Sequence, residues 1–247
     1  MKAILLAAGL GTRLRPVTDK IPKCLVPIND KPLMDYWLEM LGPSEEINGI
    51  LVNTHYLANV VDTYLRNSKF AKKIKIVFEP ELLGTGGTVV KNKDFVQKDR
   101  LFLAHADNLT FFDLHAFIHA HKARPKNCVM TMMTFTTPTP ESCGIVGLDT
   151  WGVVQNFYEK VKTPPSNLAN AAVYIMEPEV VNYMVSLNKA FVDISTEIIP
   201  KFMGRIFTYH NKHYHRDIGT IESLDLANKE LSHLKGDHFG RNEISRA

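Results

Sequence analysis

Short apolar runs bounded by turn residues recur along the first half of the chain, and each run is typical of a buried strand. Stretches with apolar residues at helical spacing alternate with them: Pro32 is expected at the first position of one helix, and Asp113 is expected to cap another. This alternation predicts an α/β fold, a Rossmann-like three-layer sandwich with a mixed, mostly parallel central sheet. The expected strands are residues 2–8, 49–54, 74–78, 101–106 and 128–135.

The second half of the chain has shorter segments, which predict mixed strands at 144–148, 153–159 and 171–176, followed by an amphipathic helix at 221–234. No linker or repeat interrupts the sequence. We therefore predict one domain over residues 1–235, with a nucleotide-binding half (1–135) and a sugar-binding half (136–235), and a polar tail over 236–247.

Composition narrows the possible partners. The 247 residues are 45% hydrophobic and 22% charged, and the net charge of +3 is spread along the chain, so a nucleic-acid or membrane partner is not expected. Three cysteines far apart in the sequence favour neither a disulfide framework nor a metal motif. The apolar start is too short to span a membrane, and a cytoplasmic protein is expected, with a homo-oligomer left open.

A glycine-rich turn follows the first apolar run, with the sequence Gly9-Leu10-Gly11-Thr12-Arg13. Its glycines let the backbone approach phosphate oxygens, although a tight turn without a ligand explains them equally well. It is neither a dinucleotide fingerprint nor a P-loop. Lys23 lies among apolar residues and prolines that are expected to hold its side chain in place.

At this point the sequence resembles the sugar-1-phosphate nucleotidyltransferases, whose signature is the same turn followed by Pro-Lys and Leu-x-Pro. Among them it is most similar to compact mannose- or heptose-1-phosphate guanylyltransferases and N-acetylmuramate-1-phosphate uridylyltransferases. The resemblance implies the nucleotide-diphospho-sugar transferase fold and a set of nucleotide-binding residues. These are Leu6, Ala8, Gly9, Gly11, Thr12, Arg13, Lys23, Glu79, Gly84, Thr85 and Asp107.

Two carboxylates are candidate metal ligands. Asp107 follows the apolar run 101–106, at the sheet edge where ligands bind, although it could instead cap a turn. Asp217 lies in a segment that resembles the family's Trp-x-Asp-x-Gly-Thr. Together they predict a Mg²⁺ site that phosphate oxygens complete. Zinc on His213, His215 and Asp217 is the less favoured alternative.

The resemblance also assigns the two substrates. Glu79 stands where thymidylyl- and some uridylyltransferases carry Gln, and a carboxylate accepts hydrogen bonds, which favours guanine. Glycines at 84–87 are equally explained by a strand-to-helix junction. The implied sugar-phosphate site departs from the family pattern at Cys143 and Val161. Its residues are Asn108, Gly144, Glu159, Lys160, Asn170 and Asp217.

The implied reaction is Mg²⁺-dependent in-line attack of a sugar 1-phosphate on the α-phosphate of an NTP, with Arg13, Lys23, Asp107 and Asp217 as catalytic residues. GTP with mannose or heptose 1-phosphate is the favoured pair, for cell-envelope polysaccharide synthesis. The alternatives are UTP or dTTP with a glucose-like or N-acetylmuramic sugar, or a non-catalytic regulatory subunit. His115, His119 and His121 are expected on a helix surface.

Overall fold

The computed structural model describes residues 1–236, which form two compact units that interleave along the chain. Unit 1 contains residues 1–4, 82–104 and 111–213. Unit 2 contains residues 5–81 and 105–110 and the chain from residue 214 onward. One domain with two contiguous halves stays a prediction, and the predicted tail, 236–247, lies outside the described residues except for its first.

Unit 1 is built on a mixed sheet. Its strands follow the order β10-β9-β11-β6-β1, with β8 paired to β11 and β12 paired parallel to β8. The β9–β10 and β6–β11 pairs are antiparallel. The bounds are β1 Lys2–Leu6, β6 Leu101–His105, β8 Met130–Thr136, β9 Gly144–Leu148, β10 Val154–Glu159, β11 Leu168–Met176 and β12 Ile206–His210.

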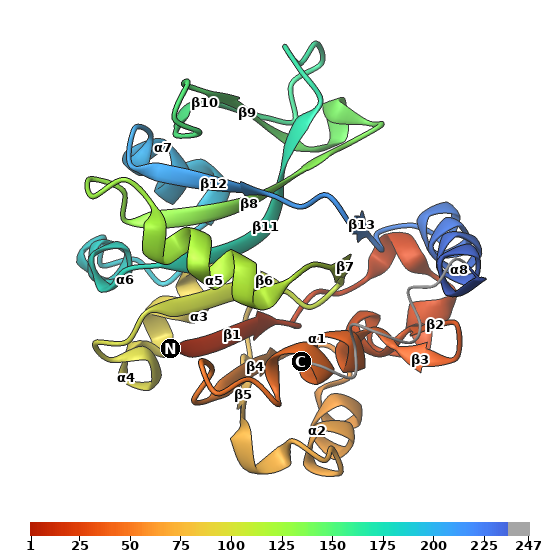
Figure 1. Ribbon diagram of the computed structural model, residues 1–247. Coiled ribbons are helices and arrows are strands. Elements are labelled where there is room, and N and C mark those ends of the chain that lie inside the picture. The colour runs from red at the N-terminus through yellow and green to blue at the C-terminus, as the bar shows by residue number, and fades with distance from the viewer. Residues whose placement is uncertain (237–247) are drawn as a thin grey trace. The chain divides into compact units, whose positions relative to one another are not determined.

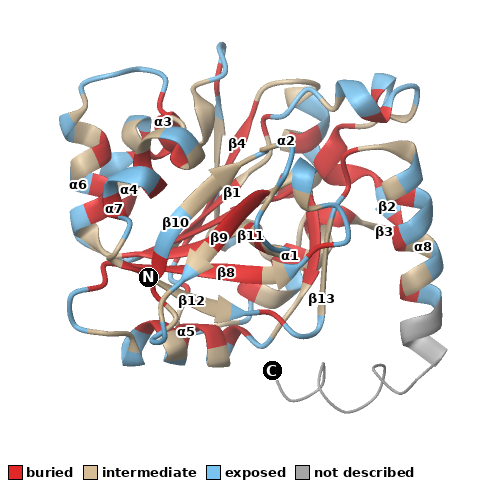
Figure 2. Cartoon of the chain, turned by 90° about the horizontal axis from the view of Figure 1, so that it is seen from above, coloured by how far each residue is buried: buried red, intermediate tan, exposed pale blue. Residues whose placement is uncertain are grey.

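Helices lie on both sides of this sheet. Helix α5 (Leu114–Ala123) covers one face, while α3 (Gly84–Lys91), α6 (Pro178–Ser186) and α7 (Ile199–Phe202) lie on the other (Figures 1 and 2). The short α4 (Lys93–Val96) follows α3. Strand β6 is completely buried from Leu101 to Ala104, as its apolar run predicts. The predicted architecture, a mixed sheet with helices on both sides, is confirmed.

Unit 2 carries the parallel strands β4 (Ile50–Thr54) and β5 (Ile74–Phe78). Both strands were expected within a residue of their observed bounds. Its helices are α1 (Leu33–Leu41), α2 (Ala58–Arg66) and α8 (Ile221–Gly236). Two small sheets complete it, β2 (Pro27–Ile28) with β3 (Lys31–Pro32), and β7 (Asn108–Phe111) with β13 (Tyr214–Asp217).

Helix α1 begins one residue later than predicted. Pro32 belongs to β3 and has ψ near 138°, an extended conformation, so Leu33 is the first helical residue. Asp113 does cap α5 as expected, because its side chain accepts a hydrogen bond from the backbone N–H of Ala116 at 3.0 Å. No helix within residues 1–236 is long and apolar enough to cross a membrane.

The prediction that all three histidines of α5 lie on its surface is wrong for His121. His115 and His119 are exposed, whereas the His121 side chain is 1% exposed. Its Nδ1 lies 2.8 Å from Thr131 Oγ1, and its Nε2 lies 3.3 Å from Glu177 Oε1. Glu177 also pairs with Arg100 and Arg124, so a network of charged side chains replaces the solvent expected at this position.

His121 should make the protein less stable in acid. Burial lowers the pKa of His121 to about 4, aided by repulsion from Arg124, although Glu177 opposes the shift. Below pH ~6.5 His121 binds a proton in the unfolded chain but not in the folded chain. The free energy of unfolding therefore decreases as the pH falls toward 4. We expect His121 to account for a loss of about 2 kcal/mol in unfolding free energy between pH 7 and pH 5.

Urea unfolding of the wild type and His121→Gln at pH 7, 6 and 5 measures this contribution. The variant should lose less stability over that range, whatever its absolute stability at pH 7. His119→Gln, on the exposed side of the same helix, should follow the wild type. Parallel pH profiles for the wild type and His121→Gln would contradict the assignment.

Candidate active site

The glycine-rich turn begins where β1 ends and is anchored in unit 2. The backbone N–H of Ala7 donates to Asn53 Oδ1 at 2.7 Å, and the Asn53 side chain lies at the buried end of β4. Gly11 then adopts a φ of +64° and caps the 3₁₀ helix Thr12–Leu14. Thr18 Oγ1 donates to the carbonyl of Gly11 at 2.7 Å and closes the turn from the other side.

Gly11 is required by both backbone and packing. Its φ lies in the left-handed region that favours glycine. A Cβ at this position would lie 2.9 Å from Thr18 Cγ2 and 3.3 Å from Lys23 Cβ. The turn therefore packs directly against the residue that holds the buried lysine.

Gly11→Ala should lower the free energy of unfolding by about 1–3 kcal/mol, because a left-handed alanine adds strain to the clash with Thr18. Thermal or urea unfolding measures the loss. Gly9→Ala is the matched control, since a Cβ at Gly9 meets no atom within 4 Å. Equal losses in the two variants would contradict the packing role of Gly11.

A buried cation and two carboxylates meet beside this turn. Lys23 Nζ lies 2.6 Å from Asp107 Oδ2 and 3.4 Å from Asp217 Oδ1. The exposed fraction is 10% for the Lys23 side chain, 27% for Asp107 and 56% for Asp217. Arg13 Nη2 lies 4.0 Å from Asp217 Oδ2 on the exposed side. The four predicted catalytic residues are thus brought together within unit 2.

The charges of this cluster stabilise one another. Burial lowers the pKa of Lys23, but attraction to Asp107 and Asp217 outweighs it, so the pKa is raised and the amine is charged at neutral pH. Burial alone would raise the pKa of Asp107, yet Lys23 and then His105 lower it below its usual value. Burial and repulsion from His105 lower the pKa of His215 to about 3, so its ring is neutral.

Backbone contacts hold the two carboxylates near each other. The N–H of Ile218 donates to the carbonyl of Asp107 at 3.2 Å, and Ser223 Oγ donates to the carbonyl of Asp217. Thr110 Oγ1 adds a bond to the carbonyl of Tyr214 at 3.0 Å, beside the β7–β13 pair. Hydrogen bonds therefore hold the backbone segments that carry the two carboxylates.

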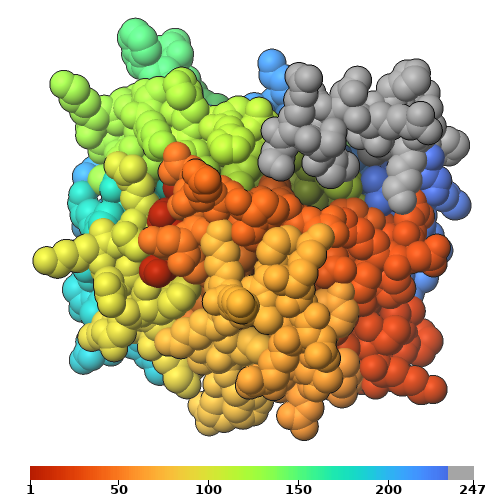
Figure 3. All heavy atoms as spheres, turned by 60° about the horizontal axis from the view of Figure 1, so that its bottom comes forward, coloured from red at the N-terminus to blue at the C-terminus, as the bar shows by residue number. Residues whose placement is uncertain are grey.

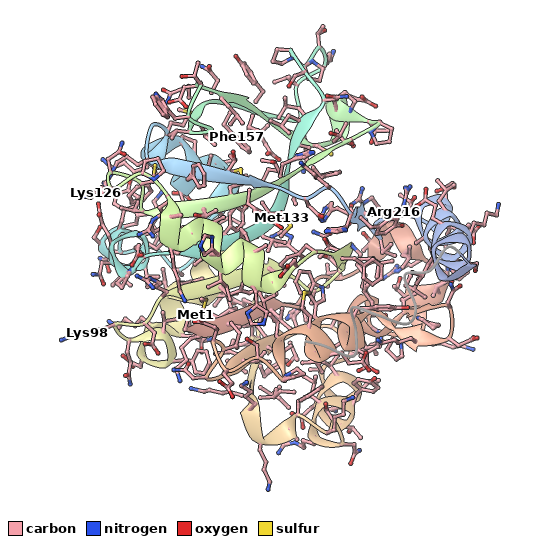
Figure 4. All side chains as sticks on the ribbon, in the orientation of Figure 1. Met1, Lys98, Lys126, Met133, Phe157 and Arg216 are labelled. Carbon is pink, nitrogen blue, oxygen red and sulfur yellow. The ribbon has the colours of Figure 1, made fainter. Side chains whose placement is uncertain are left out.

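An ion pair that the sequence did not indicate fastens β13 to α8. Arg216, labelled in Figure 4, donates two hydrogen bonds to the Glu230 carboxylate, at 3.0 and 2.6 Å. Tyr214 Oη donates to the same carboxylate at 2.8 Å. The partners lie 14 and 16 residues apart, a separation without a local sequence signal. This brace fixes the strand that carries Asp217.

The other nucleotide-site predictions fall in both units. In unit 2, Leu6 and Ala8 flank the end of β1, Thr12 is exposed, and Glu79 is 1% exposed. His55 Nδ1 donates to the carbonyl of Glu79 at 2.7 Å, and the Glu79 N–H donates to Thr54 at 2.8 Å. These bonds fix the backbone at Glu79 after β5.

The glycine segment at 84–87 lies in unit 1 and has a structural role there. The N–H groups of Gly86 and Gly87 donate to the carbonyl of Val192, and a Cβ at Gly84 would lie 2.6 Å from that oxygen. Thr85 Oγ1 accepts the N–H of Ile194 at 2.8 Å. Close packing against residues 190–194 explains these residues without a ligand.

The residues predicted to bind the sugar phosphate are also divided between the two units. Asn108 is buried in unit 2, and its carbonyl accepts Trp37 Nε1–H at 3.0 Å. In unit 1, Gly144 pairs with Glu159 across β9 and β10, and a Cβ there would lie 2.4 Å from the ring of Phe157, labelled in Figure 4. Lys160 Nζ lies 3.5 Å from Glu159 Oε1.

Asn170 already has local partners for both ends of its amide. Its Oδ1 accepts the N–H of Ala172 at 3.0 Å, and its Nδ2 donates to Tyr174 Oη at 2.6 Å. The strand is irregular here, because Ala172 has a φ of +53° and the β8–β11 register shifts between Asn170 and Tyr174. Asn170 thus stabilises a bulge, a role that the sequence did not indicate.

The zinc alternative and a surface hollow are the remaining features. Within residues 1–236, no three His, Cys, Asp or Glu side chains gather to hold a metal ion, and His213, His215 and Asp217 therefore form no zinc cluster. A surface hollow of about 880 Å³ lies on unit 2, on the face where α2 comes forward (Figure 3). Its lining is Leu25, Asp35, Glu39, Asn59, Val60, Thr63, Tyr64, Asn67, Ser68, Lys69 and Phe70.

Known proteins match this chain over nearly its whole length. It is 34% identical over 82% of its residues to a Synechocystis UTP–glucose-1-phosphate uridylyltransferase, of whose length it spans 55%. It is 30% identical over 90% of its residues to the D-glycero-α-D-manno-heptose 1-phosphate guanylyltransferase of Campylobacter jejuni, and spans 96% of that protein. The crystal structure of HddC from Yersinia pseudotuberculosis, 23% identical, superposes with a TM-score of 0.75 over 93% of this chain and 99% of that one.

The family model described as nucleotidyl transferase matches residues 2–233. That range contains the glycine-rich turn, Lys23, both carboxylates and the segment that joins β13 to α8. The chain belongs to the nucleotidyl transferase family.

Proposed function

We propose that this protein joins a nucleoside triphosphate to a sugar 1-phosphate and releases pyrophosphate. The observation that carries the proposal is the cluster of Lys23, Asp107 and Asp217 beside a glycine-rich turn, with Arg13 at its exposed side. Such a cluster suits two anionic substrates, because positioning them and balancing their charge is the main task in phosphoryl transfer. The family match and the names of the relatives support the same reaction.

Asp107 and Asp217 fit a magnesium ion. Both carboxylates already converge on a cation, the ammonium of Lys23, and hard oxygen ligands are those that Mg²⁺ prefers. When bound, the ion would neutralise charge on the phosphate oxygens of the triphosphate. The two carboxylates are a typical number of protein ligands for Mg²⁺, which is commonly bound by one or two carboxylates together with substrate phosphates.

The residues of the chain then have separate tasks. The backbone at Gly9 and Gly11 lies against the triphosphate, while Lys23 and Arg13 offer positive charge to it. Lys160 of unit 1 offers charge to the sugar 1-phosphate, and Glu159 accepts bonds from sugar hydroxyls. Each of these assignments follows the family resemblance.

The reaction is an in-line displacement. A sugar phosphate oxygen forms a bond to the α-phosphorus as the bond from that phosphorus to the bridging oxygen of pyrophosphate breaks. No general base is required, because a phosphate with a second pKa of about 6 is already dianionic near neutral pH. The enzyme lowers the barrier by orientation and by charge balance.

We favour GTP with a mannose or heptose 1-phosphate as substrates. The place of Glu79 in the family pattern favours guanine, since a carboxylate can accept hydrogen bonds from the ring N–H and the amino group. Its side chain is buried in this structure, so the contact requires it to turn toward the base. The Campylobacter guanylyltransferase supports it too, because the two chains correspond over nearly their full lengths. The Synechocystis relative, named for UTP and glucose 1-phosphate, supports the alternative pair.

A substrate panel tests the proposal. Pyrophosphate release is measured with Mg²⁺ for GTP, UTP, dTTP, CTP and ATP, each combined with mannose, glucose, heptose and N-acetylmuramate 1-phosphates. We expect release with GTP and mannose or heptose 1-phosphate. Release only with UTP or dTTP would overturn the guanine assignment of Glu79 and leave the reaction class standing, whereas no release from any pair would favour a non-catalytic regulatory subunit.

A further inference from the structure

The candidate magnesium site contains a cation that belongs to the protein. Lys23 Nζ lies 2.6 Å from one oxygen of Asp107 and 3.4 Å from one oxygen of Asp217. These are the two carboxylates that the proposed function assigns to Mg²⁺. An ammonium in this position balances one of their two negative charges and repels a second cation.

Lys23 is firmly held in that position. It lies at the start of the 3₁₀ helix Lys23–Leu25, where the N–H of Leu25 donates to the carbonyl of Pro22 at 2.8 Å and the N–H of Val26 to that of Lys23 at 3.2 Å. Its side chain is only 10% exposed, and its Cβ is packed behind Gly11. Because the root of the side chain is fixed, only its flexible end can move away from the carboxylates.

The two carboxylates differ in how far solvent reaches them. The Asp217 side chain is 56% exposed and the Asp107 side chain is 27% exposed. The bond from Ile218 N–H to the Asp107 carbonyl holds the backbones that carry the two carboxylates close together. A metal ion that reaches Asp217 from solvent therefore meets the ammonium already in place.

We infer that Lys23 is a built-in counter-ion of the metal site, which keeps Mg²⁺ affinity low until a triphosphate binds. The triphosphate carries more negative charge than the sugar 1-phosphate, so it is the reactant that we expect to attract the ammonium away from Asp107 and Asp217. Metal and nucleotide then bind together, and each strengthens the binding of the other by the same factor. This inference rests on the proposed metal site and adds that metal binding there depends on the nucleotide.

Metal binding without nucleotide tests the inference. Mn²⁺ is titrated into the wild-type protein, Lys23→Met and Lys23→Arg, and free Mn²⁺ is followed by its EPR signal. Lys23→Met should bind Mn²⁺ at least about 10-fold more tightly than the wild type, because its carboxylates have lost their counter-ion, a gain equal to about 1.4 kcal/mol. Lys23→Arg keeps the charge and should remain as weak as the wild type.

Two controls locate the effect. Lys20→Met removes an exposed lysine from the same segment and should leave Mn²⁺ affinity unchanged. Adding Asp107→Ala to Lys23→Met should abolish the gain. Lys23→Gln replaces Lys23→Met if thermal unfolding shows that the latter is not folded.

Equal or weaker Mn²⁺ binding by the folded, uncharged variants would overturn the inference, and so would a gain that survives Asp107→Ala. Neither result concerns turnover. The proposed function fails separately, if the wild-type protein releases no pyrophosphate from any substrate pair.

Discussion

Asp107→Ala should lower turnover at least about 100-fold, an increase of roughly 2.7 kcal/mol in the activation barrier. Asp107 is the less exposed of the two carboxylates and makes the shorter contact with Lys23, at 2.6 Å. Its loss would remove a proposed metal ligand and leave the buried lysine without its main partner. Steady-state pyrophosphate release at saturating substrates measures the change.

Asp62→Ala is the matched control for this experiment. Asp62 lies on α2 and forms an exposed ion pair with Arg66, with side chains 36% and 71% exposed. Because such pairs contribute little to stability, its removal should leave turnover within about twofold of the wild type. A folded Asp107→Ala protein with near-normal turnover would refute the metal assignment.

Lys23→Met should lower kcat/KM for the nucleotide by at least about 100-fold, the scale for losing one preorganised electrostatic group. Attraction to Asp107 and Asp217 raises the pKa of Lys23 despite its burial, so the wild-type side chain is charged under all ordinary assay conditions. Methionine is unbranched like lysine and one atom shorter, so the variant keeps most of the side chain and loses the charge. Initial rates at varied NTP measure the effect.

Two further variants separate charge from packing at this position. Lys20→Met, in the same segment but exposed, should behave as the wild type. Lys23→Arg keeps a positive charge and should retain more activity than Lys23→Met. If Lys23→Met keeps kcat/KM within threefold of the wild type, the triphosphate does not depend on this lysine.

The parts of the site that sequence alone predicted have local signals. Glycines after an apolar strand, a lysine between prolines and an aspartate at a strand end are each visible within a few residues. The resemblance to a family then assigned these residues to one site, although Lys23 lies 84 residues from Asp107 and 194 residues from Asp217 in the sequence. Their side chains meet in unit 2, and their catalytic role stays a prediction.

The features that sequence did not predict depend on contacts between distant segments. His121 looks like a surface residue by helical spacing, but its pocket is formed by Thr131 and by Glu177, far along the chain. Asn170 is predicted to contact the sugar from its place in a motif, and its side chain also bonds the bulge at Ala172, a contact that the motif does not indicate. Helical spacing or a local motif does not indicate which residue, distant in the sequence, will contact a given side chain.

The most direct test of the central claim is a ³¹P NMR measurement of wild-type protein with Mg²⁺, an NTP and a sugar 1-phosphate. The proposed reaction predicts that pyrophosphate and a nucleotide diphospho-sugar appear in equal amounts, while free NDP and inorganic phosphate stay absent. Pyrophosphate without a nucleotide sugar, release of inorganic phosphate, or unchanged substrates with every pair tested would contradict it.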